Sequence, residues 1–162
     1  MIEKNKILLL DAIDKRILQE LQNNARISNV ELSKRVNLSP TPCLERVKRL
    51  EKAEVIQGYH AVVCPIKTNT SLLVFIEVTL EKTNNKVFQE FADRVNNYSE
   101  ILECHMIAGG FDYLLKLRFS DIQQYREFLG KGLGTLPSVS LTHTHIVSEE
   151  IKDTSYNDLR NI

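Results

Sequence analysis

The stretch ISNVELSKRVNLSPTPCLERVKRL, residues 27–50, contains the start signals of two short helices separated by a three-residue turn. Ser28 followed by Glu31 is a capping box, in which each side chain hydrogen-bonds the backbone N–H of the other residue. Ser39 can cap the next helix, and Pro40 falls at its first position, where a backbone N–H would have no partner within the helix. This arrangement predicts a helix-turn-helix.

The second of these helices is expected to bury one face and to present a basic face to solvent. Residues 26–50 contain 6 basic and 2 acidic side chains, although the whole chain has a formal net charge of +0. Such a local surplus suits a phosphate-facing surface, and a merely solvated charged face is the alternative. The expected buried stripe is Cys43, Leu44, Val47 and Leu50, and the expected outward residues are Thr41, Pro42, Glu45 and Arg49, with Arg46 and Lys48 on the flanks.

We predict that this motif binds double-stranded DNA. Arg46 and Arg49 are expected to contact phosphates or base edges, and Lys48 mainly phosphates. Glu45 either accepts a hydrogen bond from a cytosine amino group or pairs with Arg49, four residues further on. The residues assigned to the DNA contact are Ser28, Ser39, Thr41, Glu45, Arg46, Lys48 and Arg49.

Outward from this motif, the chain divides into two domains of the α+β class. Asp11 can cap a helix that precedes the motif, and residues 55–63 have the pattern of a strand. Residues 1–62 are therefore expected to form a winged helix-turn-helix domain, followed by a linker over residues 63–70. Residues 71–162 show the β-α-β-β-α-β order of a ferredoxin-like domain. Its expected strands are 71–81, 101–108, 112–119 and 139–147, and its expected helices are 85–97 and one that starts at a Ser120–Gln123 capping box.

The second face of this sheet is too apolar to remain in contact with water. Two helices can cover one face of a four-stranded sheet, so a partner subunit is expected to cover the other. The domain is therefore a predicted dimerisation domain. The residues assigned to the uncovered face are Leu73, Phe75, Ile101, Ile107 and Leu114, beside Glu77, Glu103, Lys116 and Arg118.

Composition excludes several other classes of protein. The chain has 162 residues, of which 43% are hydrophobic and 26% charged, as in an ordinary globular protein. It has no apolar run long enough for a membrane span, and its three cysteines lack paired spacing, so we expect a reduced, cytoplasmic protein. No nucleophile–base constellation is evident, so we do not expect an enzyme. His143 and His145 share a strand face without a further ligand at fixed spacing, so no metal site is expected.

Two stretches resemble a known family. RISNVELSKRVNLSPTPCLERVKRLEKAEVIQGY, residues 26–59, resembles the DNA-binding module of the Lrp/AsnC, or feast/famine, bacterial regulators. ILECHMIAGGFDYLLKLR, residues 101–118, contains that family's G-x-x-D-Y turn as Gly109, Asp112 and Tyr113. The resemblance implies a transcriptional regulator of amino-acid metabolism. It also implies dimers through the ferredoxin-like domain, called RAM, that often assemble into octamers.

The resemblance further implies an amino-acid effector site near this turn, at interfaces between RAM domains. The thioether and branched apolar side chains of the site suit leucine or methionine as the ligand. The charged side chain of a ligand such as aspartate or lysine would be buried there without a partner. Asp112 either accepts the ligand's ammonium group or binds backbone N–H groups as a turn residue. No cofactor beyond the effector is expected. The matching positions are Met106, Gly109, Gly110, Phe111, Asp112, Tyr113, Ile122, His145, Ile146 and Val147.

Overall fold

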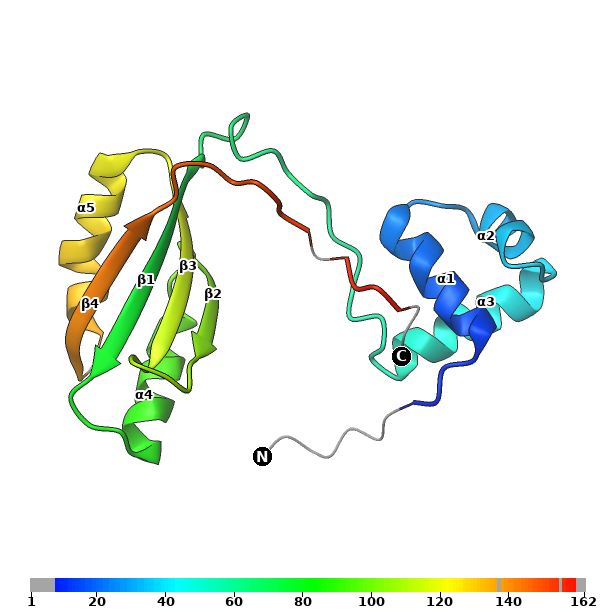
Figure 1. The fold of residues 1–162 in the computed structure, drawn as a ribbon. Coiled ribbons are helices and arrows are strands. Elements are labelled where there is room, and N and C mark those ends of the chain that lie inside the picture. The colour runs from blue at the N-terminus through cyan, green and yellow to red at the C-terminus, as the bar shows by residue number, and fades with distance from the viewer. Residues whose placement is uncertain (1–7, 137, 155, 160–162) are drawn as a thin grey trace. The chain divides into compact units, whose positions relative to one another are not determined.

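The computed structural model describes residues 8–136, 138–154 and 156–159. The chain divides into a helical unit, formed by residues 1–62 with 153–162, and a sheet unit of residues 63–152 (Figure 1). The described residues contain no helix long and apolar enough to cross a membrane. The helical unit contains α1 (Ala12–Asn23), α2 (Asn29–Arg35) and α3 (Pro40–Lys52), and the sheet unit contains β1 (Leu72–Leu80), α4 (Asn85–Val95), β2 (Ile101–Met106), β3 (Tyr113–Phe119), α5 (Ile122–Lys131), the short 3₁₀ helix η1 (Leu133–Thr135) and β4 (Val139–Ile146).

Local capping hydrogen bonds set the starts of α1 and α2, whereas α3 begins at Pro40 after Ser39, whose side chain makes none of the predicted capping hydrogen bonds. Asp11 caps α1, and it forms a full capping box with the aspartate at position 14. Ser28 accepts a hydrogen bond from the backbone N–H of Glu31 at 3.2 Å, so α2 begins where the sequence predicts. The Glu31 carboxylate pairs with Arg35 instead, so the second hydrogen bond of the predicted capping box is not found among the described residues. The turn between α2 and α3 places Asn37 in the left-handed region, with φ of 58°. A short polar side chain tolerates this conformation better than a branched one.

The three helices share one apolar core, and a segment from the far end of the chain joins it. Leu159 packs against this core, and the backbone N–H and carbonyl of Asn157 hydrogen-bond the side-chain amide of Gln22 at 2.7 and 3.1 Å. The described residues beyond Lys152, which are 153–154 and 156–159, therefore belong to the helical unit, although the sequence pattern assigned all of 71–162 to the other domain. The buried core residues are Ile17, Leu18, Leu32, Val36, Cys43 and Leu50.

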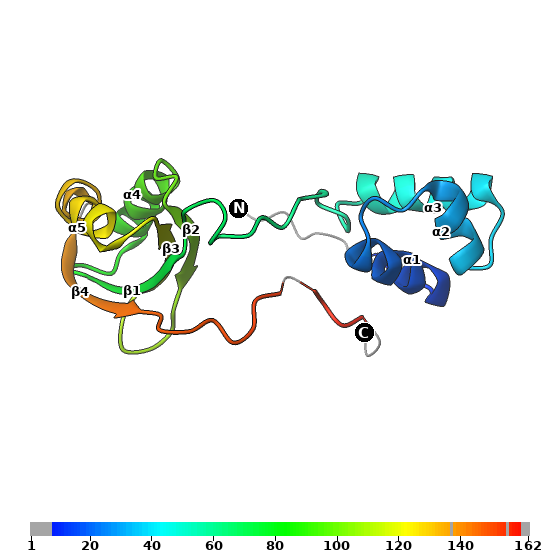
Figure 2. The ribbon, with the colours of Figure 1, turned by 90° about the horizontal axis from the view of Figure 1, so that it is seen from above.

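The sheet unit has the predicted β-α-β-β-α-β order. Its four antiparallel strands lie in the order β2-β3-β1-β4. Figure 2 shows α4 and α5 on the same side of the sheet. The core lies between these helices and the alternate inward residues of β1 and β3, from Val74 to Leu80 and from Tyr113 to Phe119. The opposite face carries Phe75 and Leu114, both only partly buried in the single chain.

Three local predictions differ from the structure. Residues 55–63 form no strand, because an extended segment becomes a strand only when another strand pairs with it. Ile101 packs on the helix-covered side, because a register shift between it and Glu103 reverses the alternation. The cap of α5 is Asp121 rather than Ser120, since the Asp121 carboxylate accepts the backbone N–H groups of the two glutamines that follow Ile122.

Candidate DNA-binding and effector sites

Helix α3 buries one face in the helical unit and exposes the other. Cys43 and Leu50 are completely buried, at 0% exposure, whereas Thr41 and Lys48 are exposed. Leu44 is 41% exposed, so its assignment to the buried stripe was wrong. The physical reason is the period of the helix: Leu44 lies one turn from both Thr41 and Lys48 and shares their face.

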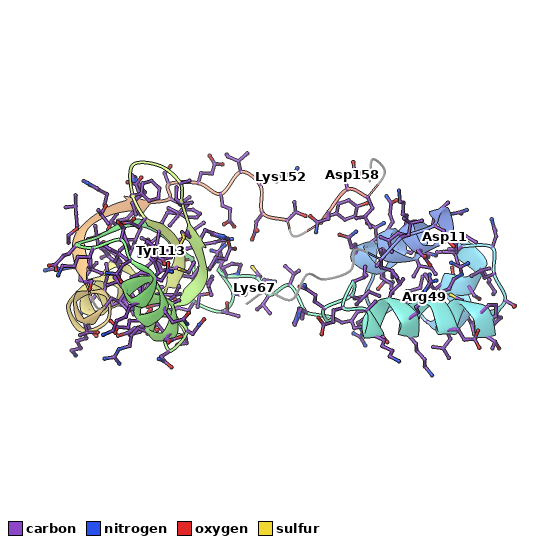
Figure 3. The ribbon with its side chains drawn as sticks, turned by 90° about the horizontal axis from the view of Figure 1, so that it is seen from below. Asp11, Arg49, Lys67, Tyr113, Lys152 and Asp158 are labelled. Atoms are coloured by element: carbon purple, nitrogen blue, oxygen red, sulfur yellow. The ribbon has the colours of Figure 1, made fainter. Side chains whose placement is uncertain are left out.

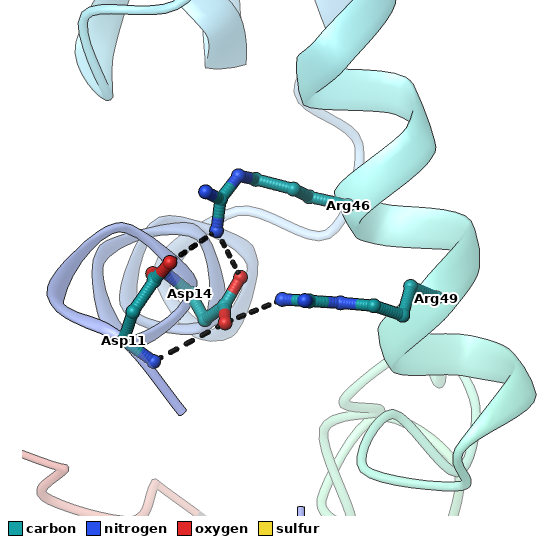
Figure 4. Close-up of polar contacts among 4 residues, drawn as sticks. All are labelled: Asp11, Asp14, Arg46 and Arg49. Carbon is teal, nitrogen blue, oxygen red and sulfur yellow. Dashed lines mark hydrogen bonds and ion pairs between the residues drawn. The ribbon is translucent and has the colours of Figure 1, made fainter. Parts of the chain in front are cut away.

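The arginines of α3 point toward α1 rather than away from the unit. Figure 3 shows Asp11 and Arg49 within the helical unit, and Figure 4 shows the ion pairs that join the two helices. Arg46 Nη1 lies 2.6 Å from Asp11 Oδ2 and 2.8 Å from Asp14 Oδ1. Arg49 Nη2 lies 2.5 Å from Asp14 Oδ2. The side chain of Asp14 is 1% exposed, so a buried carboxylate is shared by two guanidinium groups.

This network also shifts the pKa of its exposed members. The backbone N–H of Asp14 and the Arg46 guanidinium hold the pKa of Asp11 below its ordinary value. Hydrogen bonds to Asp11 and Asp14 raise the pKa of Arg46. A buried carboxylate costs several kcal/mol in desolvation unless such partners are kept, so the network fixes the crossing of α1 and α3.

The other residues assigned to DNA contact have different surroundings. Ser39, Thr41, Glu45 and Lys48 are all exposed along α3 or at its start. The hydroxyl of Ser28 is used as the cap of α2. The pairing of Glu45 with Arg49 is not found among the described side chains, where the acidic partner of Arg49 is Asp14.

Sequence reasoning missed Asp14. The available signal was the Asp11-x-x-Asp14 spacing at a helix start, three residues apart on one face, upstream of a helix with basic residues. Nothing in that spacing identifies Arg46 and Arg49, which lie 32 and 35 residues further along the chain, as the partners of Asp14.

The turn between β2 and β3 is attached to the end of β1 by Asp112. Its Oδ2 accepts the backbone N–H of Leu80 at 2.7 Å, and its own N–H donates to the carbonyl of Val78 at 2.9 Å. The carboxylate therefore has the structural role that we weighed against ligand contact. Its Oδ1 has no hydrogen-bond partner among the described residues. A Cβ at Gly110 would meet no atom within 4 Å, so the space beside the turn is open in the single chain.

A groove of about 640 Å³ runs between α4 and the edge strand β2. Tyr113 forms part of its wall, and its ring stacks on Phe91 with centroids 4.4 Å apart. Burial is the largest cause of the raised pKa of Tyr113, and burial also raises the pKa of the Cys104 thiol. The lining residues are Asn85, Phe88, Gln89, Ala92, Val95, Asn96, Cys104, Met106 and Tyr113.

The residues assigned to the effector site fall into two groups at opposite ends of the sheet. Met106 and residues 109–113 lie where β3 begins, whereas Ile122 follows the end of β3. Residues 145–147 lie at that same far end, because β4 pairs Ile146 with Val74 near the start of β1. The seven residues of β3 span about 20 Å. One chain therefore does not gather all ten residues into a single pocket.

The histidines of β4 face the uncovered side of the sheet. His145 Nε2 lies 3.1 Å from Glu77 Oε1, and the strand register places His143 opposite Glu77. Within the described part of the chain, no cluster of three or more His, Cys, Asp or Glu residues is arranged to hold a metal ion.

Both units match known families. Residues 10–57 match a winged helix-turn-helix DNA-binding family, and residues 73–156 match the Lrp/AsnC ligand binding domain. The chain belongs to the Lrp/AsnC family. It is therefore a DNA-binding transcriptional regulator with a ligand-binding domain, and not an enzyme. The predicted two-part architecture, a helix-turn-helix followed by a RAM fold, is confirmed.

Relatives of this Lrp/AsnC chain match over nearly its whole length. The leucine-responsive regulatory protein of Haemophilus influenzae is 52% identical over 155 residues, which cover 96% of this chain and 93% of the relative. That of Escherichia coli (strain K12) is 54% identical over 146 residues, 90% of this chain and 89% of the relative. The solved structure of a Neisseria meningitidis transcriptional regulator in complex with L-Met has a TM-score of 0.89 and 39% identity, with 94% of this chain and 98% of that chain covered.

Proposed function

We propose that this Lrp/AsnC regulator controls genes of amino-acid metabolism by binding specific double-stranded DNA through α3, and that leucine or methionine modulates this binding. The observation that carries the proposal is the two-sided character of α3. One side is fixed to the unit by Cys43, Leu50 and the ion pairs to Asp14, and the other side is exposed along the helix. A rigidly held helix with a free polar face suits entry into a major groove.

In this proposal, different residues of the helical unit take different shares of the DNA contact. Thr41, Glu45 and Lys48 face the bases or the adjacent phosphates, and Ser28 and Ser39 lie at helix starts, where backbone N–H groups suit phosphate oxygens. Arg49, whose side chain is 48% exposed, reaches a phosphate with Nε and Nη1 while Nη2 remains on Asp14. Arg46, at 27%, contributes mainly by holding the helix in place.

The effector site is proposed to form between copies of the chain. The two groups of site residues lie about 20 Å apart in one sheet unit, so a shared pocket needs a second copy that brings its far end to the turn. The uncovered sheet face, with Phe75 and Leu114, is the proposed dimer surface, and dimers then assemble into octamers. Operators are expected to be imperfect palindromes with half-sites about one helical turn apart, or a multiple of it.

The chemistry around the turn favours an uncharged amino acid. Asp112 Oδ1 is available to the ligand's ammonium group while Oδ2 stays on Leu80, and backbone N–H groups near Gly109 and Gly110 suit its carboxylate. Met106, 59% exposed in the single chain, is a flexible thioether wall for an aliphatic or thioether side chain. The Neisseria meningitidis structure with L-Met and the names of the leucine-responsive relatives support this choice.

Two measurements on the full chain test the proposal. A thermal-shift screen with the twenty common amino acids is expected to raise the melting temperature with leucine or methionine, because binding stabilises the folded state. A mobility shift with random duplex at low salt is expected to show DNA binding. A protein-binding sensor would respond to the amino acid and leave the duplex unshifted, and that result would contradict the proposal.

As a regulator of this kind acts on DNA, we place it in the cytoplasm.

A further inference from the structure

We propose that Leu44 contacts a base directly and recognises the C5-methyl group of a thymine in the operator. This inference rests on the DNA-binding function proposed above. The neighbouring leucines of the same unit, Leu32 and Leu50, are 2% and 0% exposed, whereas Leu44 is 41% exposed. Leu9 of the same unit is 92% exposed, so exposure alone does not mark Leu44, and the inference rests on its position on the helix.

Leu44 lies within the exposed face of α3. Thr41 precedes it by three residues and Lys48 follows it by four, so the three side chains lie in a row along one side of the helix. All three are exposed, and the opposite side is the buried one. Leu44 is also the fifth residue of α3, and recognition helices contact base edges with residues near their N-terminal ends.

The groups that could recognise a guanine from this helix are turned away from that row. Arg46 and Arg49 both donate to Asp14 on the α1 side. Lys48 is a point charge on a flexible stem, which suits a phosphate. The centre of the row therefore presents an apolar side chain that has no hydrogen-bonding group. In the major groove, the apolar feature of a base edge is the thymine methyl group.

The surroundings of Leu44 favour DNA over an apolar protein partner. A protein-docking surface of this kind requires a contiguous apolar patch. Around Leu44 on its own helix the exposed side chains are Pro40, Thr41, Glu45 and Lys48, of which all but Pro40 are polar or charged. A small apolar group between polar neighbours matches the edge of a base pair, where a methyl group lies beside hydrogen-bonding atoms.

The test uses an operator selected from random duplexes with the full-length wild-type protein. Each thymine of that operator is replaced in turn by deoxyuridine, which removes the methyl group and keeps the base pairing. At one thymine of each half-site, the wild type is expected to lose affinity about fourfold, the value of one buried methyl group. Leu44→Ala is expected to bind the thymine and deoxyuridine duplexes equally well. Val30→Ala is the matched control, because Val30 is 53% exposed on α2, and it is expected to keep the wild-type discrimination.

The outcomes separate this inference from the proposed function. If the wild type binds its selected operator but Leu44→Ala still distinguishes thymine from deoxyuridine as the wild type does, the role of Leu44 is overturned and DNA binding stands. The same holds if no single deoxyuridine weakens wild-type binding. If the folded wild type selects no duplex at all, the proposed function fails and this inference fails with it. Circular dichroism of Leu44→Ala excludes unfolding as the cause of a loss.

Discussion

Arg49 of α3 donates a hydrogen bond from Nη2 to Oδ2 of Asp14 in α1, over 2.5 Å. Asp14 is buried and Arg49 is half exposed, so the pair joins the interior of the helical unit to its surface. This geometry makes Asp14 a support of α3, the helix that we propose to contact DNA, although Asp14 lies outside the helix-turn-helix itself.

Replacing Asp14 by alanine is expected to destabilise the helical unit by about 3 kcal/mol, because the hydrogen bonds that its carboxylate accepts from two guanidinium groups and one backbone N–H are lost. Hydrogen exchange in the full chain measures this loss of stability separately in the helical unit and in the sheet unit. The amides of α1 and α3 are expected to exchange about a hundredfold faster, while those of β1 and β3 keep the wild-type rate. Glu45→Gln, an exposed substitution in the same unit, is the control and is expected to change stability by less than about 0.5 kcal/mol. Equal protection in Asp14→Ala and the control would show that the network contributes little.

The stability of the helical unit is expected to vary with pH in part because of Asp11. The folded-state pKa of Asp11 lies below its ordinary value of 3.8, so Asp11 stabilises the fold above that value. This contribution is lost as the pH falls through the lowered pKa. Asp11→Asn keeps an N-cap oxygen and removes the charge, so its hydrogen-exchange protection is expected to change less than that of the wild type as the pH is lowered from about 5 to 2. If protection falls with pH to the same extent in the wild type and in Asp11→Asn, the lowered pKa of Asp11 would be contradicted.

Lys48→Ala is expected to weaken binding to all duplexes to a similar extent, because phosphate contacts carry no sequence information. The slope of log K against log salt is expected to flatten by about one unit. Lys86→Ala is the matched control, since Lys86 is an exposed lysine of α4 whose acidic partner is Glu90. An unchanged salt slope for Lys48→Ala, equal to that of the control, would place Lys48 outside the interface.

Phe75→Arg, on the uncovered sheet face, is expected to convert the proposed dimer into monomers, since a charge would have to be buried between the two copies. Sedimentation at micromolar concentration measures the change. Gln124→Arg, at an exposed position of α5, adds the same side chain elsewhere and is expected to leave the assembly intact. Identical sedimentation of the two variants would rule out this face as the dimer surface.

Local signals predicted the parts of the fold that depend on local physics. The cap at Ser28 follows from a side chain three residues from the backbone N–H that it accepts. The order of strands and helices follows from residue periodicity, which each segment carries by itself.

Features set by distant partners could not be predicted in this way. The pairing of Asp14 with Arg49 depends on how two helices cross, and the face of Ile101 depends on a register shift with β3. The segment 55–63 has the pattern of a strand but no paired strand in the single chain. The resemblance supplied the effector residues as one set, whereas the strand order separates Asp112 from Ile122 by the length of β3.

The most direct test of the account is the effect of leucine and methionine on operator binding by the wild type and by Asp112→Asn, measured by fluorescence anisotropy and paired with calorimetry of the amino acid alone. The asparagine keeps an oxygen for the Leu80 N–H and removes the negative charge. The wild type is expected to bind leucine or methionine, but not aspartate or lysine, and to change its operator affinity when either effector is added. Asp112→Asn is expected to bind the operator with unchanged affinity and to lose both the heat of binding and the response. Equal heats for the two proteins, or tight aspartate binding by the wild type, would contradict the account.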